Sequence, residues 1–150
     1  MRPNSIKPSK PDTRELFERA DRMWNSGKLR NAFNLFLQAA KAGDRDSQLN
    51  TGYFYDKGIG VKRDLRKALR WYLTAYRRGD ASAANNIGTI WRDRKEHRKA
   101  LWWFKRAVKL GNEASNFAIA IHFLKLKSKV VFFDNCIEEH QSINALAKVI

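Results

Sequence analysis

The sequence predicts an all-α protein in which short antiparallel helix pairs stack on one another. Three observations predict it. Apolar residues recur with helical spacing along most of the chain, and no stretch of comparable length alternates between apolar and polar residues. One pattern of small and aromatic residues also returns at offsets of 36 and 32 residues. Because one helix pair cannot bury its own apolar face, neighbouring pairs have to stack.

The helices are predicted in chain order from capping and spacing signals. The first is expected over 14–26, with Thr13 as its N-cap and Gly27 as its stop signal. Further helices are expected over 29–42, 45–57, 65–78, 81–92, 97–110, 112–126 and 135–148. Each of the first three pairs therefore has a first and a second helix joined by a turn.

The chain divides into three predicted parts. All three prolines lie in the first eleven residues, so residues 1–11 are predicted to form a mobile tail. The repeat solenoid is predicted over 12–129. Residues 130–150 are predicted to form a divergent C-terminal cap, whose helix opens with a capping box of Asn135 and Glu138.

The repeated pattern is clearest in the second helix of each pair. Its members are Ala32, Leu35, Phe36, Ala39 and Gly43, then Ala68, Trp71, Tyr72, Ala75 and Gly79, then Ala100, Trp103, Phe104, Ala107 and Gly111. In the first helices, Asn50, Gly52 and Tyr55 recur as Asn86, Gly88 and Trp91. We expect the glycines of the first set at the turns between pairs. We expect the repeated tryptophans in the core: Trp24, Trp71, Trp91 and Trp103.

Residues 46–80 carry a more specific pattern: a helix with Gly52 and Tyr55, the loop Gly58-Ile59-Gly60-Val61, a Lys67-Ala68 opening and the pair Trp71-Tyr72. This pattern resembles the Sel1-like repeats, relatives of the tetratricopeptide repeats, and the resemblance extends over about residues 14–127. It implies a right-handed α-solenoid that serves as a scaffold or adaptor. The connection 92–97 lacks the Gly-x-Gly-Val loop, so its turn is predicted to be tetratricopeptide-like.

The composition favours acidic partners and a reducing compartment. Thirty Lys and Arg residues against fifteen Asp and Glu give a net charge of +15, which predicts attraction to acidic proteins, nucleic acid or anionic membrane. The single cysteine, Cys136, excludes an intrachain disulfide. With no secretory signal and no transmembrane stretch in the sequence, we expect a cytoplasmic protein that does not insert into a membrane.

The stack would place its charges unevenly. Turns within the pairs share one edge, here called the basic edge, and turns between pairs share the opposite edge. The basic edge comprises Lys28, Arg30, Lys57, Lys62, Arg63, Arg66, Lys67, Arg92, Arg94, Lys95, Arg98, Lys99, Lys125, Lys127 and Lys129, with four acids. The opposite edge has five basic residues, Lys41, Arg45, Arg77, Arg78 and Lys109, and four acids. A solvated rim is the alternative to a binding surface.

Candidate partner-binding residues at and beside the basic edge include one aromatic residue predicted to be exposed. They are Arg63, Arg66, Arg94, Lys95, Arg98, Lys99, Trp102 and Lys105. Trp102 replaces Asn34 and Arg70 at an otherwise polar helix position. It either packs under arginine side chains by cation–π contact or anchors a partner.

The resemblance implies a concave inner surface lined by the first helices. Candidate residues there are Asn50, Tyr53, Asn85, Asn86, Thr89, Arg92, Phe117 and Lys125. Amides can pair with an extended backbone, and Arg92 and Lys125 could hold a carboxylate. A structural role is the alternative for Asn50 and Asn86, and burial under the last helix is the alternative for Phe117.

No catalytic motif, metal-ligand spacing or cofactor motif surrounds the three histidines, His97, His122 and His140. The sequence therefore predicts a non-enzymatic adaptor that binds an acidic protein or peptide. Two other functions stay open: an inhibitor that holds a toxin inactive, such as an immunity protein, and a basic nucleic-acid-binding protein, which is the second choice of partner class.

Overall fold

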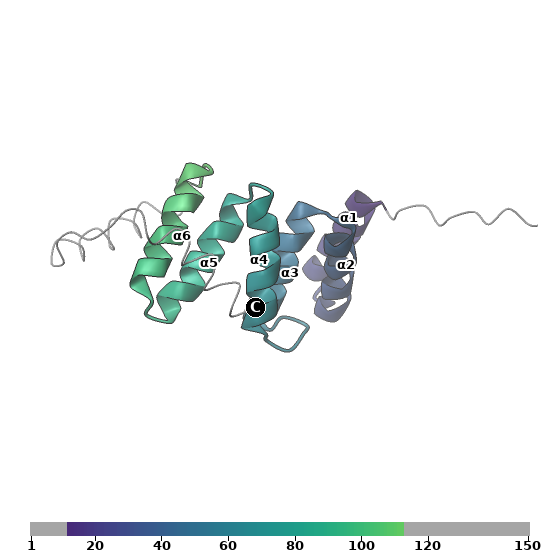
Figure 1. Cartoon of the computed structure of the whole chain (residues 1–150). Helices are drawn as coiled ribbons and strands as arrows, with labels where there is room; N and C mark the ends of the chain where they lie inside the picture. The colour runs from purple at the N-terminus through teal and green to yellow at the C-terminus, as the bar shows by residue number, and fades with distance from the viewer. Residues whose placement is uncertain (1–11, 113–150) are drawn as a thin grey trace, which may run out of the picture.

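The computed structural model describes residues 12–112, which form six α-helices in three antiparallel pairs. The helices are α1 (Thr13–Asn25), α2 (Leu29–Ala42), α3 (Arg45–Lys57), α4 (Leu65–Arg77), α5 (Ala81–Asp93) and α6 (His97–Lys109). They lie side by side in chain order, and neighbours run in opposite directions (Figure 1). The all-α stack is confirmed: residues 12–112 contain no strand, and each helix boundary lies within one residue of its expected place.

Several expectations concern other parts of the chain. The tail over 1–11, the helices over 112–126 and 135–148, and the cap over 130–150 lie outside the described residues, apart from Asn112. The domain division over 12–129 and 130–150 therefore stays a prediction.

Aspartate side chains begin four of the helices. Asp12, Asp44, Asp64 and Asp80 each accept a hydrogen bond from a backbone N–H in the first helical turn. The expected N-cap at Thr13 was wrong, because the carboxylate of Asp12 accepts from the N–H groups of Arg14 and Glu15 and leaves Thr13 as the first helical residue. These caps fix where the first helix of each pair and the helix α4 start.

The turns between pairs use glycine as predicted. Gly43, Gly79 and Gly111 have φ of 103°, 85° and 94°, a backbone region that other residues rarely adopt. At the first of these turns, the Arg78 guanidinium donates to the Gly43 carbonyl oxygen, which joins the first two helix pairs along the opposite edge. Arg45 Nε in α3 lies 3.9 Å from Oδ2 of Asp80, the N-cap of α5, so this contact joins the second pair to the third.

The core is built from one large ring per second helix and one small residue per first helix. Phe36, Tyr72 and Phe104 are all 0% exposed. Gly52 lies directly under Tyr72 and Gly88 under Phe104, because a Cβ atom on either glycine would come within 2.7 Å of the ring. The repeated small residues thus set the close approach of the two helices in a pair.

The four repeated tryptophans divide into two groups. Trp91 and Trp103 are buried, with Trp103 packing edge-on against Tyr76 of the preceding pair at 5.0 Å between ring centroids. Trp24 and Trp71 are half-buried and pack against the core, so the expectation of core tryptophans holds for them only in part.

Two kinds of turn join the helices within a pair. In the first and third pairs, three residues form a turn with the same hydrogen bonds: Gly27 N–H donates to Trp24 O, and Lys95 N–H donates to Arg92 O. Both residues are left-handed, with φ of 73° and 62°. The third turn is therefore of the short kind predicted for it.

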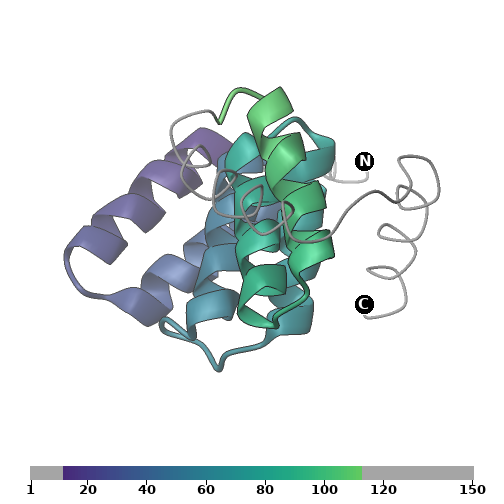
Figure 2. The ribbon, with the colours of Figure 1, turned by 90° about the vertical axis from the view of Figure 1, so that its left-hand side faces the viewer.

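The second pair has a longer connection, 58–64, which lies at the lower edge of the stack in both views (Figure 1 and Figure 2). It packs on the first turn of α2, because a Cβ atom on Gly60 would come within 2.6 Å of the Leu29 carbonyl. The basic edge thus has a contact between the first two pairs as well.

Candidate functional site

The inner surface of the first helices carries an aromatic pair. The rings of Trp24 in α1 and Tyr53 in α3 are stacked, with centroids 6.0 Å apart and planes inclined by 30°. Both side chains are half-buried, and Lys57 Nζ lies 6.0 Å from the Tyr53 centroid. Tyr53 was a predicted site residue, whereas Trp24 was assigned to the core. The residues at the equivalent position of the next two repeats are Asp56 and Arg92. Because both are charged, the sequence could have indicated that Trp24 faces the inner surface.

The amides and the threonine predicted for this surface are partly exposed and differ in their surroundings. Asn50, Asn85, Asn86 and Thr89 are all half-buried. The Asn85 Oδ1 atom is buried without a hydrogen-bond partner among residues 12–112. Asn86 interacts with the Tyr72 hydroxyl, which favours the structural alternative for Asn86.

The Tyr72 hydroxyl lies beneath the inner surface. It is buried and makes no hydrogen bond of normal geometry within the described part of the chain. Burial raises the pKa of Tyr72 well above its usual range, and the negative charge of Asp56 and the nearby Tyr53 raise it further, while Asn86 lowers it in part. This hydroxyl stays neutral in the folded protein at physiological pH.

The charges at the end of the inner surface are paired locally. Arg92 donates from Nε and Nη2 to Asp93 Oδ1 at 3.1 and 3.0 Å. Asp56 is buried beside Lys57, whose Nζ lies 3.1 Å from Asp56 Oδ2. The other two candidates for this surface, Phe117 and Lys125, lie outside the described residues.

Some cations of the basic edge hold the repeat together. Lys67 Nζ lies 3.5 Å from Asp64 Oδ2 and 5.3 Å from the Tyr55 ring centroid. The hydrogen bond from the Lys67 N–H, aided by the Lys67 charge, holds the pKa of Asp64 below its usual value. Each of these residues has a counterpart one repeat later. This cluster therefore recurs in the third pair.

In the third pair, Lys99 Nζ lies 3.5 Å from Glu96 Oε2 and 4.6 Å from the Trp91 ring centroid. The Arg94 guanidinium lies 5.5 Å from the same ring centroid. In the long loop, Arg63 Nε donates to the Asp56 carbonyl oxygen at 2.8 Å. Three candidate binding residues, Arg63, Arg94 and Lys99, thus have structural contacts.

Other cations of the basic edge are exposed, and their side chains make no hydrogen bond or ion pair with residues 12–112. These are Lys28, Arg30, Lys62, Arg66 and Lys95. Arg98 is also exposed but has an interaction of its own. Lys105, on the outer side of α6, is exposed.

The prediction that Trp102 is an exposed aromatic was wrong. Its side chain is 8% exposed, because the Arg106 guanidinium lies 3.0 Å from its ring centroid and Trp103 packs edge-on at 4.8 Å. Arg106 follows Trp102 by one helical turn, the spacing at which side chains on a helix meet. The cation–π alternative describes this residue.

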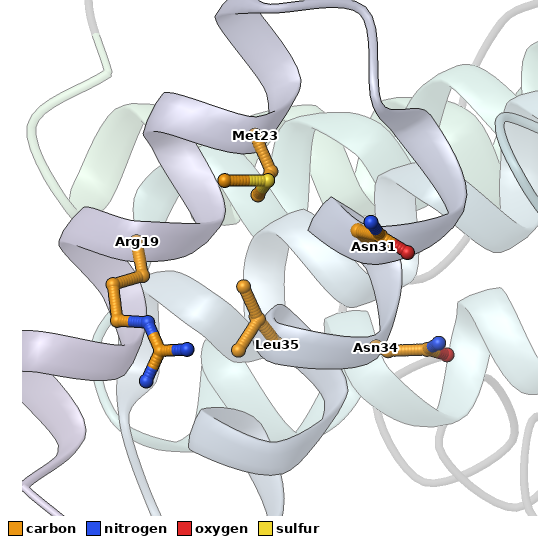
Figure 3. Close-up of a pocket in the computed structure, with 5 residues that line it drawn as sticks. All are labelled: Arg19, Met23, Asn31, Asn34 and Leu35. Atoms are coloured by element: carbon orange, nitrogen blue, oxygen red, sulfur yellow. The ribbon is translucent and has the colours of Figure 1, made fainter.

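A shallow pocket of about 280 Å³ lies at the α1–α2 end of the stack and was not predicted from the sequence. Arg19 and Met23 project into it from α1, and Asn31, Asn34 and Leu35 from α2 (Figure 3). The repeat counterparts of Arg19 are Thr51 and Ile87, both 0% exposed. The pocket thus occupies the face that a preceding helix pair covers elsewhere in the stack.

Within residues 12–112, no group of three or more His, Cys, Asp or Glu residues could hold a metal ion. No helix of this part is long and apolar enough to cross a membrane. His122, His140 and Cys136 lie outside it.

The Sel1 repeat matches this chain at residues 28–44, 45–80 and 81–112, which correspond to α2 and the two pairs after it. The chain belongs to the Sel1 repeat family. Sel1 repeat proteins are generally adaptors for protein–protein interactions. The family match also assigns the short third turn to the same repeat as α5 and α6, although that turn lacks the glycine loop.

Several curated proteins are similar over these Sel1 repeats. A putative sel1-like repeat-containing protein of Acanthamoeba polyphaga mimivirus is 34% identical over 89 residues, covering 59% of this chain and 17% of the viral protein. A chitin synthase regulator of Saccharomyces cerevisiae is 36% identical over 73 residues, or 45% of this chain and 10% of the regulator. The rat DAP3-binding cell death enhancer 1 is 34% identical over 59 residues, or 39% and 12%. The chain thus spans less than a fifth of each of these proteins.

Two solved structures have the same arrangement of Sel1 repeats. A Sel1 repeat protein from Oxalobacter formigenes is 25% identical with a TM-score of 0.59, covering 71% of this chain and 46% of the other. A protective antigen of uropathogenic Escherichia coli with the same fold is 20% identical with a TM-score of 0.65, covering 93% and 30%. The second likeness concerns the fold alone.

Proposed function

We propose that this Sel1 repeat protein is a non-enzymatic, cytoplasmic scaffold that holds an acidic segment of a protein partner against its basic edge. The adjoining chain of the partner lies on the inner surface, across the stacked Trp24 and Tyr53 rings. The names of two relatives, a chitin synthase regulator and a DAP3-binding protein, support a protein as the partner class.

The observation that carries the proposal is the uneven distribution of unpaired cations. Five exposed cations of the basic edge make no ion pair with the described residues, and they come from all three helix pairs. On the opposite edge, Arg45 and Arg78 are engaged with neighbouring pairs, and three exposed cations, Lys41, Arg77 and Lys109, have no ion pair with the described residues. A carboxylate-rich segment that approaches the protein therefore meets more open positive charge along the basic edge.

The test compares two triple charge reversals. Changing Arg30, Lys62 and Arg66 to Glu removes open cations of the basic edge. The matched control changes Lys41, Arg77 and Lys109, which are equally exposed on the opposite edge. Both variants lower the net charge by the same amount.

Association with poly-L-glutamate, followed by stopped-flow fluorescence, should slow at least tenfold in the first variant and much less in the control. Added salt should reduce the difference, because it screens charges beyond about 8–10 Å at physiological strength. Equal slowing in both variants would mean that net charge alone matters. Tighter binding of duplex RNA than of poly-L-glutamate at physiological salt would favour the nucleic-acid function instead.

A further inference from the structure

The turn between α5 and α6 contains an unusual backbone. Lys95 has φ of 62° and is the only non-glycine residue with positive φ among residues 12–112. The other six left-handed positions in this part are all glycine. For an L-residue with a long side chain, this conformation is unfavourable because Cβ approaches the following carbonyl oxygen.

The same turn in the first pair shows that glycine suits this position. Gly27 has φ of 73° and makes the hydrogen bond equivalent to that of Lys95, and the residues on either side also bond alike. The fold therefore does not require a lysine here. The Lys95 side chain is exposed and makes no hydrogen bond or ion pair with residues 12–112, so no contact offsets the backbone cost.

The surroundings of Lys95 are positive and fixed. Arg94 and Lys99 both lie over the Trp91 ring, which holds their charges next to the turn. Glu96 is engaged by Lys99 and Asp93 by Arg92, so the nearest carboxylates already have partners. In this turn, the Lys95 ammonium therefore stays open to an incoming carboxylate.

We propose that Lys95 is a primary contact of the basic edge, kept in a strained backbone position because its ammonium binds carboxylates of an acidic segment in the partner protein. Strained residues persist where function selects the side chain over the backbone preference. This inference rests on the proposed function and names one residue that carries it.

Two substitutions at this position separate the backbone from the charge. Lys95→Gly removes both the strain and the ammonium. Lys95→Asn removes the ammonium but keeps a residue that tolerates the left-handed region. Lys28→Asn is the matched control, because Lys28 is an exposed, unpaired cation of the first turn with an ordinary φ of −81°.

Lys95→Gly should raise the folding equilibrium constant about two- to fivefold in urea titrations, since relief of strain exceeds the added flexibility of glycine. Both Lys95 variants should bind poly-L-glutamate at least threefold more weakly than the unchanged protein. Lys28→Asn should weaken binding to poly-L-glutamate by less than about 1.5-fold, which is half of the loss expected for the Lys95 variants.

Three results would overturn the inference. The first is a loss of stability in Lys95→Gly, which would give the side chain a structural role. The second is full affinity in both Lys95 variants while the Arg30, Lys62 and Arg66 triple variant binds weakly; the proposed function would then stand without Lys95. The third is an equal loss in Lys28→Asn. Full affinity in the triple variant would instead contradict the proposed function itself.

Discussion

Replacement of Gly88 by alanine tests the close approach of helices within a pair. A Cβ atom at this position would lie 2.7 Å from Cδ1 and Cε1 of Phe104 and 3.1 Å from Cζ. Carbon atoms in good contact are separated by about 3.5–4.0 Å, so the added methyl group overlaps the ring by roughly 1 Å. Phe104 is 0% exposed, so its ring can shift only by displacing neighbouring atoms.

Two opposing terms set the size of the effect. Overpacking of a tight core costs about 1–3 kcal/mol, whereas replacing glycine by alanine inside a helix contributes about 1 kcal/mol of stability. We therefore expect a net loss of up to about 2 kcal/mol for Gly88→Ala, and a similar loss for Gly52→Ala, where the Cβ atom would lie 2.6 Å from the Tyr72 ring.

Urea unfolding followed by far-ultraviolet circular dichroism measures this change as a shift of the midpoint. Ala20 occupies the same repeat position in α1 and is fully buried, so Ala20→Gly should lose about 1 kcal/mol through helix propensity and about 0.8 kcal/mol more through the buried methyl group. The double variant Gly88→Ala with Phe104→Leu should recover part of the loss. If Gly88→Ala instead raised stability by about 1 kcal/mol, the ring would not lie against the helix backbone and the packing described here would be wrong.

Two further predictions concern buried aromatic residues and use the same unfolding measurement. Tyr72→Phe should leave stability unchanged or slightly higher, because the buried hydroxyl makes no hydrogen bond of normal geometry with residues 12–112. Since burial raises the folded pKa of Tyr72, stability should fall as pH rises above about 10, where only the unfolded tyrosine ionises, and Tyr72→Phe should flatten this slope; equal slopes would contradict the burial. Trp103→Ala should cost about 3–5 kcal/mol and Trp71→Ala about half as much, because only Trp103 is fully buried. Equal losses would contradict this ranking.

The helices were predictable because local and repeated signals agree. Glycines after the second helices and aspartates before several helices mark their ends independently of the apolar period, so each boundary lies within one residue of its expected place. At Thr13 two candidate caps were adjacent, and the carboxylate of Asp12 formed the hydrogen bonds. Sequence spacing does not distinguish such neighbours.

The candidate surfaces were less predictable, because exposure depends on contacts between helices. Trp102 occupies a polar helix position, but whether Arg106 covers its ring depends on side-chain rotamers. Lys99 counts as one of many basic residues in the sequence, whereas its contact with Trp91 requires α5 and α6 to pack. Trp24 fits the apolar period of α1, and only the position of Tyr53 in α3 brings it into the inner surface.

The contacts between helix pairs differ along the stack. Arg78 joins the first two pairs along the opposite edge, and Gly60 packs on α2 along the basic edge. The second and third pairs are joined by the approach of Arg45 Nε to Asp80 Oδ2 at 3.9 Å. The residue equivalent to Arg78 in the third pair is Leu110, which cannot donate a hydrogen bond to the Gly79 carbonyl. In a linear array, each junction contributes its own share of cooperativity. Because the first junction has both the Arg78 hydrogen bond and the packed Gly60 loop, we expect it to be the stronger of the two. We then expect α5 and α6 to separate from α1–α4 by local unfolding at a lower free energy than α1 and α2 separate from α3 and α4.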